Sequence, residues 1–105
     1  MRYIEHNLRI ARVLIQDKRN WVQGRDMVYG EAKYSLLGAL RFVAYDELDR
    51  DVAVMVLCEA LELAPGLGLD DAKTCIDLLR QWHDAPQRTH AEVLAALDRT
   101  IALCE

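Results

Sequence analysis

The sequence predicts a mainly α-helical fold built as a single domain over residues 1–105. The length suits one domain. Hydrophobic residues make up 52% of the chain and charged residues 29%, a balance that supports a compact core. Apolar residues recur at helical spacing in several segments, and no longer repeat is present. We therefore expect five helices with the third at the centre, and the sequence leaves open a small β-hairpin between the first and second.

The first helix is predicted over residues 4–17. Its buried face follows the i, i+4, i+7, i+11 spacing of one helical side. That face comprises Ile4, Leu8, Ala11 and Ile15. The following segment has no helical period and contains Gly24 and Gly30. Residues 21–23 and 27–29 could form the arms of a hairpin, with packing from Trp21 and Tyr29.

The second helix is predicted over residues 31–44. Its apolar stripe comprises Leu36, Leu37, Leu40 and Val43. Gly38 lies inside this helix, where glycine costs about 1 kcal/mol relative to alanine. We expect Gly38 to permit close approach of another helix, with a ligand as the less favoured reason.

The third helix, predicted over residues 51–63, is apolar on most sides and should be central. Asp49 or Asp51 is its expected N-cap. A turn at Pro65 and Gly66 should follow it. The fourth helix is then predicted over residues 71–82 with Asp70 as its cap.

The fifth helix has the clearest start. Thr89 and Glu92 form a T-x-x-E capping box. We expect the Thr89 hydroxyl to accept from the Glu92 amide, and the Glu92 carboxylate to accept from the Thr89 amide. Its buried face should comprise Val93, Leu94, Ala96, Leu97, Ile101 and Cys104.

The net charge of −4 is unevenly distributed. Residues 1–25 hold six basic and two acidic side chains, a net of +4, whereas residues 46–71 hold one basic and eight acidic, a net of −7. The acidic total argues against nucleic-acid binding. The asymmetry suits a charged partner, contact between the two regions within one molecule, or simple solvation.

The cellular setting is expected to be cytoplasmic. No apolar run approaches the roughly 20 residues of a membrane span, and the first residues lack the apolar core of a signal peptide. Cys58, Cys75 and Cys104 are odd in number and lack metal-ligand spacing. We expect them to be free thiols buried in the core.

Motifs that carry chemistry are sparse. The sequence has no phosphate loop, no dinucleotide fingerprint, no zinc signature and no nucleophile elbow. His83, Asp84 and His90 could in principle bind a metal, but they flank a proline-containing corner, and we expect no metal and no cofactor. The acidic run between Asp46 and Asp51 lacks the glycine and final glutamate of a calcium loop.

Two segments place a tryptophan in a polar setting, "NWVQG" and "QWHDAPQRT". The structural interpretation is that these tryptophans pack under the loops. The functional interpretation is a shared pocket that binds a ligand or partner. The residues of that predicted site are Trp21, Gln23, Arg25, Trp82, His83, Asp84 and Arg88. Asp84 and Arg88 could instead form an ion pair that braces the corner.

These segments carry a family resemblance that extends from about residue 8 to 103. The pattern W-x-D-x-P-x-R-T followed by E-V-L-x-x-L-D-R lies on residues 82–99, W-x-Q-G on 21–24 and L-G-A-L on 37–40. The chain resembles a family of small proteins of unknown function found in actinobacteria and their phages. It departs from that pattern at His83 and Gln87, where asparagine and glycine are usual, and in a shorter segment before the second helix.

Three functional hypotheses follow. The first is a non-catalytic protein that binds a protein partner or itself, and the resemblance adds a phage or mobile-element accessory role that modulates a host protein. The second is a module for an anionic or nucleotide-like small ligand, which requires the two tryptophan segments to be neighbours. The third is an enzyme with His83 and Asp84 as general acid and base.

Overall fold

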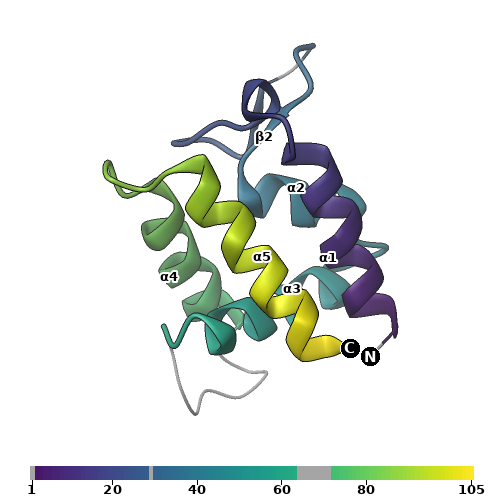
Figure 1. Cartoon of the computed structure of the whole chain (residues 1–105). Coiled ribbons are helices and arrows are strands. Elements are labelled where there is room, and N and C mark those ends of the chain that lie inside the picture. Colours follow the sequence, from purple (N-terminus) through teal and green to yellow (C-terminus); the bar gives the residue numbers. More distant parts are fainter. Residues whose placement is uncertain (1, 29, 64–71) are drawn as a thin grey trace.

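The computed structural model describes residues 2–28, 30–63 and 72–105 and contains the predicted five helices with a two-stranded hairpin between the first two (Figure 1). The helices are α1 (Arg2–Ile15), α2 (Leu36–Val43), α3 (Glu47–Ala60), α4 (Ala72–Asp84) and α5 (His90–Cys104). The 3₁₀ turn η1 (Lys18–Asn20) and the strands β1 (Met27–Val28) and β2 (Lys33–Tyr34) lie between α1 and α2. Helix α3 packs against each of the other four helices, which confirms its central position.

Helix α1 buries the predicted face, since Ile4, Leu8, Ala11 and Ile15 are all buried. The helix ends two residues earlier than predicted because Asp17 starts the next element. The Asp17 carboxylate accepts from the Arg19 amide at 2.9 Å and caps η1. This turn redirects the chain toward the end of α4.

The hairpin is present, but its predicted first arm, residues 21–23, is wrong. Strand β1 pairs in antiparallel register with β2, with Met27 opposite Tyr34 and Val28 opposite Lys33. Left-handed backbone at Gly30 (φ 79°) and Ala32 (φ 51°) folds the chain back after β1. Residues 31–34, which we predicted as helix, are therefore used for a turn and a strand. The predicted packing of Tyr29 lies outside the described residues.

Helix α2 begins at Leu36, with the Ser35 hydroxyl accepting from the Gly38 amide at 3.0 Å. A Cβ atom at Gly38 would lie 1.8 Å from the carbonyl oxygen of Asp26. The predicted close approach is therefore correct, but the neighbour is the backbone before β1 and not another helix. The Asp26 oxygen also accepts from the Ser35 amide at 2.9 Å, which fixes the two segments together.

Helix α3 begins at Glu47 and is capped by Asp46, whose carboxylate accepts from the Asp49 amide at 2.9 Å. Asp49 and Asp51, our predicted caps, lie inside the helix. Asp46 takes the role because its backbone is extended. The predicted turn and cap within residues 64–71 lie outside the described residues.

The capping box of α5 is confirmed. The Thr89 hydroxyl accepts from the Glu92 amide at 3.1 Å, and the Glu92 carboxylate accepts from the Thr89 amide at 2.9 Å. These bonds lower the pKa of Glu92, with the Thr89 amide as the largest cause.

Helices α1 and α5 lie side by side with the two termini at the same end of the molecule (Figure 1). Arg9 pairs with Glu105 at 2.5 Å, and Arg12 pairs with Asp98 at 2.6 Å. Among the described residues, no ion pair joins residues 1–25 to the acidic stretch of 46–63. Arg9 and Arg12 of α1 therefore pair with residues of α5 and its C-terminal end, and the described residues give no support to the alternative in which the two charged regions contact each other.

All three cysteines are free, as predicted. Cys58 and Cys75 are buried and Cys104 is partly buried. The Cys58 thiol donates to the Cys75 carbonyl oxygen at 3.1 Å, and burial raises the pKa of Cys58 to about 12. Within the described ranges, no helix has the length and apolarity needed to cross a membrane.

Candidate functional site

The two tryptophan segments are neighbours in space. Helix α4 ends two residues later than predicted, so its last turn carries His83 and Asp84 and meets the chain that leaves η1. The Trp21 indole Nε1 donates to His83 Nε2 at 2.7 Å. The Gln23 side-chain amide donates to the His83 carbonyl oxygen at 2.7 Å, and the Gly24 amide donates to Asp84 Oδ1 at 3.1 Å. The spatial requirement of the ligand hypothesis is therefore met.

His83 is buried and both of its ring nitrogens are engaged. Nε2 faces the Trp21 indole and also the Leu36 amide, at 3.3 Å. Both of those groups can only donate, so Nε2 must be the unprotonated acceptor. Nδ1 then carries the proton and donates it to Asp84 Oδ1 at 2.8 Å. We call these four residues, Trp21, Leu36, His83 and Asp84, the His83 joint.

The electrostatics of the joint favour a neutral imidazole. Burial lowers the pKa of His83, and the adjacent Asp84 carboxylate only partly opposes this effect. A proton on Nε2 would face two hydrogen-bond donors and leave both without an acceptor. The ring is thus held in one tautomer, and its hydrogen bonds link the chain after η1, the start of α2 and the end of α4.

The Asp84–His83 pair resembles the carboxylate–imidazole half of a catalytic triad. In a triad, the second ring nitrogen faces a nucleophile that gives up a proton. Here that nitrogen faces an indole N–H, which is not a nucleophile. The arrangement can hold segments together, but neither ring nitrogen is left to accept a proton from a substrate.

His90 is a part of this region that sequence reasoning assigned only as a weak metal ligand. Its Nε2 donates to the Ile15 carbonyl oxygen at 2.6 Å, at the end of α1. The Trp21 ring contacts both histidines, with centroids 5.6 Å from His83 and 5.5 Å from His90. The described residues contain no group of three or more side chains suited to holding a metal ion. In the sequence, the one hint of this contact was the position of His90 directly after the Thr89 cap.

The predicted Asp84–Arg88 ion pair is wrong, because neither side chain contacts the other. The Arg88 guanidinium lies 4.1 Å from the centroid of the Trp82 ring, and its Nε donates to the Trp82 carbonyl oxygen at 2.8 Å. Arg88 also pairs with Glu92 at 3.2 Å. Of the predicted site residues, Arg25 remains apart: it is exposed and makes no side-chain hydrogen bond with another described residue.

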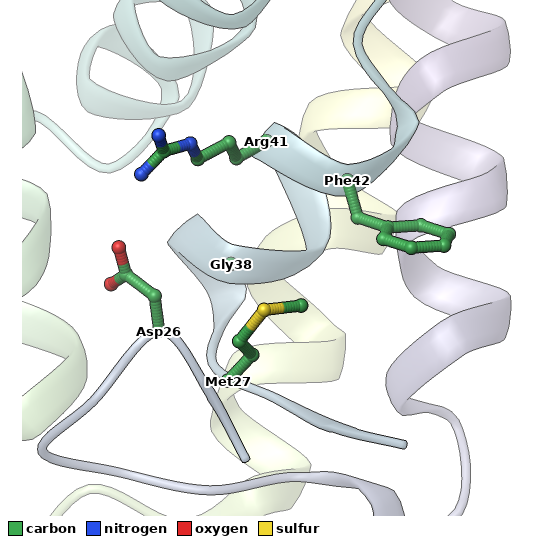
Figure 2. A pocket seen from close by; sticks show the side chains of 5 residues that line it. All are labelled: Asp26, Met27, Gly38, Arg41 and Phe42. Atoms are coloured by element: carbon green, nitrogen blue, oxygen red, sulfur yellow. The ribbon is translucent and has the colours of Figure 1, made fainter. Parts of the chain in front are cut away.

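An open hollow of about 500 Å³ lies between the segment that contains Asp26 and helix α2, where the sequence predicted no site (Figure 2). Asp26, Met27, Gly38, Arg41 and Phe42 line it. Figure 2 shows the Asp26 carboxylate and the Arg41 guanidinium facing each other on one side of Gly38, with Met27 and Phe42 on the other. Gly38 was the one sequence signal for this place, because the missing side chain marks a close approach of backbone.

A second hollow of about 220 Å³ shares Arg41 with the first. It lies where α2 passes into α3 and is lined by Arg41, Ala44, Tyr45, Asp46, Glu47 and Arg50. Three large apolar side chains are exposed at this corner: Phe42 at 59%, Tyr45 at 92% and Leu48 at 63%. We call Phe42, Tyr45 and Leu48 the corner surface.

Comparison with known proteins gives one relationship. No curated protein matches the chain, and no solved structure matches it. The model of the DUF6197 family, described as a family of unknown function, matches residues 2–103. Because that match covers nearly the whole chain, the protein belongs to the DUF6197 family.

Proposed function

We propose that the protein is a small non-catalytic interaction protein that binds other proteins through apolar side chains on its surface. The observation that carries the proposal is the grouping of its exposed apolar side chains. Among the described residues, seven large hydrophobic side chains are exposed. Three of them form the corner surface, and three more lie on one helix. Single exposed apolar residues are ordinary, but contiguous groups mark interaction sites.

The second group is the outer face of α1, which comprises Tyr3, Ile10 and Val13. Their spacing places them on one side of the helix, opposite the face that Leu8 buries in the core. Leu103 is also exposed and belongs to α5, the neighbour of α1. An amphipathic surface helix has polar residues on this side. Apolar ones here are better explained by a partner than by folding.

The chemistry of the His83 joint supports a role without catalysis. A catalytic imidazole needs a nitrogen within reach of a substrate proton. The joint instead uses both nitrogens of His83 inside the molecule. The resemblance to proteins of actinobacteria and their phages gives the proposal its most specific form, which is an accessory protein that binds and modulates a host protein.

The test compares immobilised wild type with two surface variants in a lysate of the host bacterium. One variant carries Tyr3→Glu and Val13→Glu on α1, and the other carries Phe42→Glu and Leu48→Glu at the corner surface. Lys73→Glu, on the exposed side of α4, is the matched control. We expect at least one protein that wild type and the control retain and one surface variant loses. Capture of the same proteins by every variant, or of none, would refute the proposal.

A small-ligand role is a second candidate, supported by the contact between the two tryptophan segments and the exposed Arg25. Such a ligand would have to compete with the internal hydrogen bonds of Gln23 and Asp84. Titration with inorganic phosphate and with AMP, followed by fluorescence of the two tryptophans, tests it. Saturable quenching that Arg25→Gln weakens would support this role, and unchanged fluorescence at millimolar concentrations would rule it out for these anions.

A further inference from the structure

We propose that the corner surface pairs two copies of this chain, with Tyr45 of each copy inserted into the hollow beside Gly38 of the other. The inference deepens the proposed function by naming the partner of one of its two surfaces. The outer face of α1 is left for other proteins.

The receiving half is the hollow lined by Asp26, Met27, Gly38, Arg41 and Phe42. Its volume of about 500 Å³ falls within the range of ligand pockets and so leaves room for one aromatic side chain. Gly38 lies against the Asp26 backbone at the base of the hollow, and Met27 and Phe42 supply apolar contacts on one side (Figure 2). Asp26 and Arg41 on the other side can bond a hydroxyl group, which a buried tyrosine requires.

The inserted half is Tyr45, whose side chain is 92% exposed. The chain is extended at Ala44, which ends α2, and at Asp46, which caps α3. Tyr45 is therefore held between two helix ends and projects from the corner. No core contact within the chain accounts for an aromatic side chain at this position.

The charges of the two halves are complementary. Arg41 at the receiving half makes no ion pair with another described residue, and Arg80 adds a second cation 3.7 Å from Asp26. Glu47 is the exposed second neighbour of Tyr45 and also makes no ion pair among the described residues. Insertion of Tyr45 would bring Glu47 of one copy to Arg41 of the other. Glu47 in the first turn of α3 also stabilises that helix through the helix dipole. This effect does not explain why Tyr45 is exposed.

A second copy is the occupant that this arrangement favours. Both halves lie on the same part of the surface, and Arg41 lines the hollow on each side of the corner. A two-fold axis therefore satisfies two insertions and two ion pairs at once, as in an isologous dimer. Tyrosine, phenylalanine, methionine and arginine are also the residue types enriched in protein interfaces.

Sedimentation velocity on the purified full chain, over a range of concentrations, is the first measurement. We expect a reversible shift to twice the monomer mass, and at least a tenfold weaker dissociation constant for Tyr45→Ala. Tyr3→Ala is the matched control, because it removes another highly exposed tyrosine, from α1, and should leave dimerisation unchanged. Unchanged helical circular dichroism will show that each variant is folded. A chain that stays monomeric, or a dimer that Tyr45→Ala does not weaken, would overturn the inference.

A charge exchange between copies tests the ion pair. Arg41→Glu and Glu47→Arg should each weaken self-association, since each places like charges in both contacts. Mixing the two single variants should restore it, because each copy then supplies the charge that the other needs. Restored association in the mixture would exclude an effect within one chain, because each variant alone still carries like charges at positions 41 and 47. Failure of the mixture to associate would overturn the arrangement.

The outcome also separates this inference from the proposed function. A monomeric chain whose Phe42→Glu, Leu48→Glu variant loses a captured host protein would overturn the dimer and support the broader proposal. A dimer that captures no host protein would support the inference and overturn the broader proposal.

Discussion

The His83 joint and the corner surface both combine aromatic and charged side chains, but they use them in opposite ways. In the joint, the polar atoms bond to one another inside the molecule, from Trp21 Nε1 to Asp84 Oδ1. At the corner surface, Tyr45 and Leu48 face solvent beside Arg41 and Glu47, which make no ion pair with another described residue. The comparison shows that a segment rich in Trp, His and Asp can hold the fold together. The exposed apolar surface is formed instead by residues that belong to no recognisable motif.

The largest expected effect is the loss of the joint. His83→Leu would keep the volume but remove the acceptor for the Trp21 indole and the buried Leu36 amide. Each unsatisfied buried group costs roughly 1–3 kcal/mol, so we expect the free energy of unfolding to fall by about 4 kcal/mol in urea denaturation. His6→Leu, at an exposed position on α1, is the control and should change it by less than about 0.5 kcal/mol. An equal small loss in both variants would end the structural role assigned to His83.

The contact between Gly38 and the Asp26 backbone should be nearly as sensitive to substitution. Gly38→Ala places a Cβ 1.8 Å from the Asp26 oxygen, so the backbone must shift. We expect a loss of about 3 kcal/mol in the free energy of unfolding, at the upper end of overpacking costs. Gly24→Ala is the comparison, because its Cβ meets nothing within 4 Å and only the φ of +83° is strained. That variant should lose about 1–2 kcal/mol, and a larger loss there than at Gly38 would contradict the account.

The joint should also make stability depend on pH. The pKa of His83 is lowered in the folded chain, so the unfolded chain binds more protons as the pH falls below its usual value of about 6.5. The free energy of unfolding should therefore be highest above that pH and decrease below it, by at most about 1.4 kcal/mol per pH unit for this one group. Denaturation curves between pH 7.5 and 5.5 measure it. The His83→Leu variant should lack this component of the slope, and an identical slope in both chains would disprove the assignment.

A charge exchange at the end of α4 should fail to rescue stability. Asp84→Arg and Arg88→Asp should each cost about 1–3 kcal/mol, because each removes bonds to different partners. The double variant should lose about the sum of the two single losses, as expected for residues that share no interaction. Recovery toward wild-type stability in the double variant would show that the two side chains pair after all.

The smallest effect is expected at the corner surface. Tyr45→Ala and Leu48→Ala should change the unfolding free energy of the dilute chain by less than about 0.5 kcal/mol, since both side chains face solvent. Thermal or chemical denaturation at the lowest usable concentration measures this. A loss above about 1 kcal/mol would mean that these residues serve the monomer fold and would remove the contrast with the joint.

The sequence predicted what local periodicity and capping determine. The five helices, the buried face of α1 and the Thr89–Glu92 box were all readable, because each depends on residues within a few positions of one another. The pairing of β1 with β2 was not, since short strands have little preference of their own and left-handed backbone at Ala32 is unusual for a residue with a Cβ.

The candidate site was predictable in part for a similar reason. The sequence singled out the Trp21 and Trp82 segments but left open whether they meet, because their contact joins residues about 60 positions apart. Asp84 and Arg88 looked like a pair because they are close in sequence, yet tertiary contacts gave each a different partner. The hollow beside Gly38 was missed because its lining residues are scattered and individually ordinary.

The neighbouring positions of α1 and α5 have a consequence for how the chain is made. Bonds between them join residues as far apart as 96 positions, such as Arg9 and Glu105. A ribosome synthesises α1 first and α5 after every other described element, so α2 and α3 can pack against α1 earlier, but the side that contacts α5 must wait. Contacts this distant in sequence also slow folding after release. During that interval the side of α1 that contacts α5 is open to water, and the nascent chain would present it to chaperones.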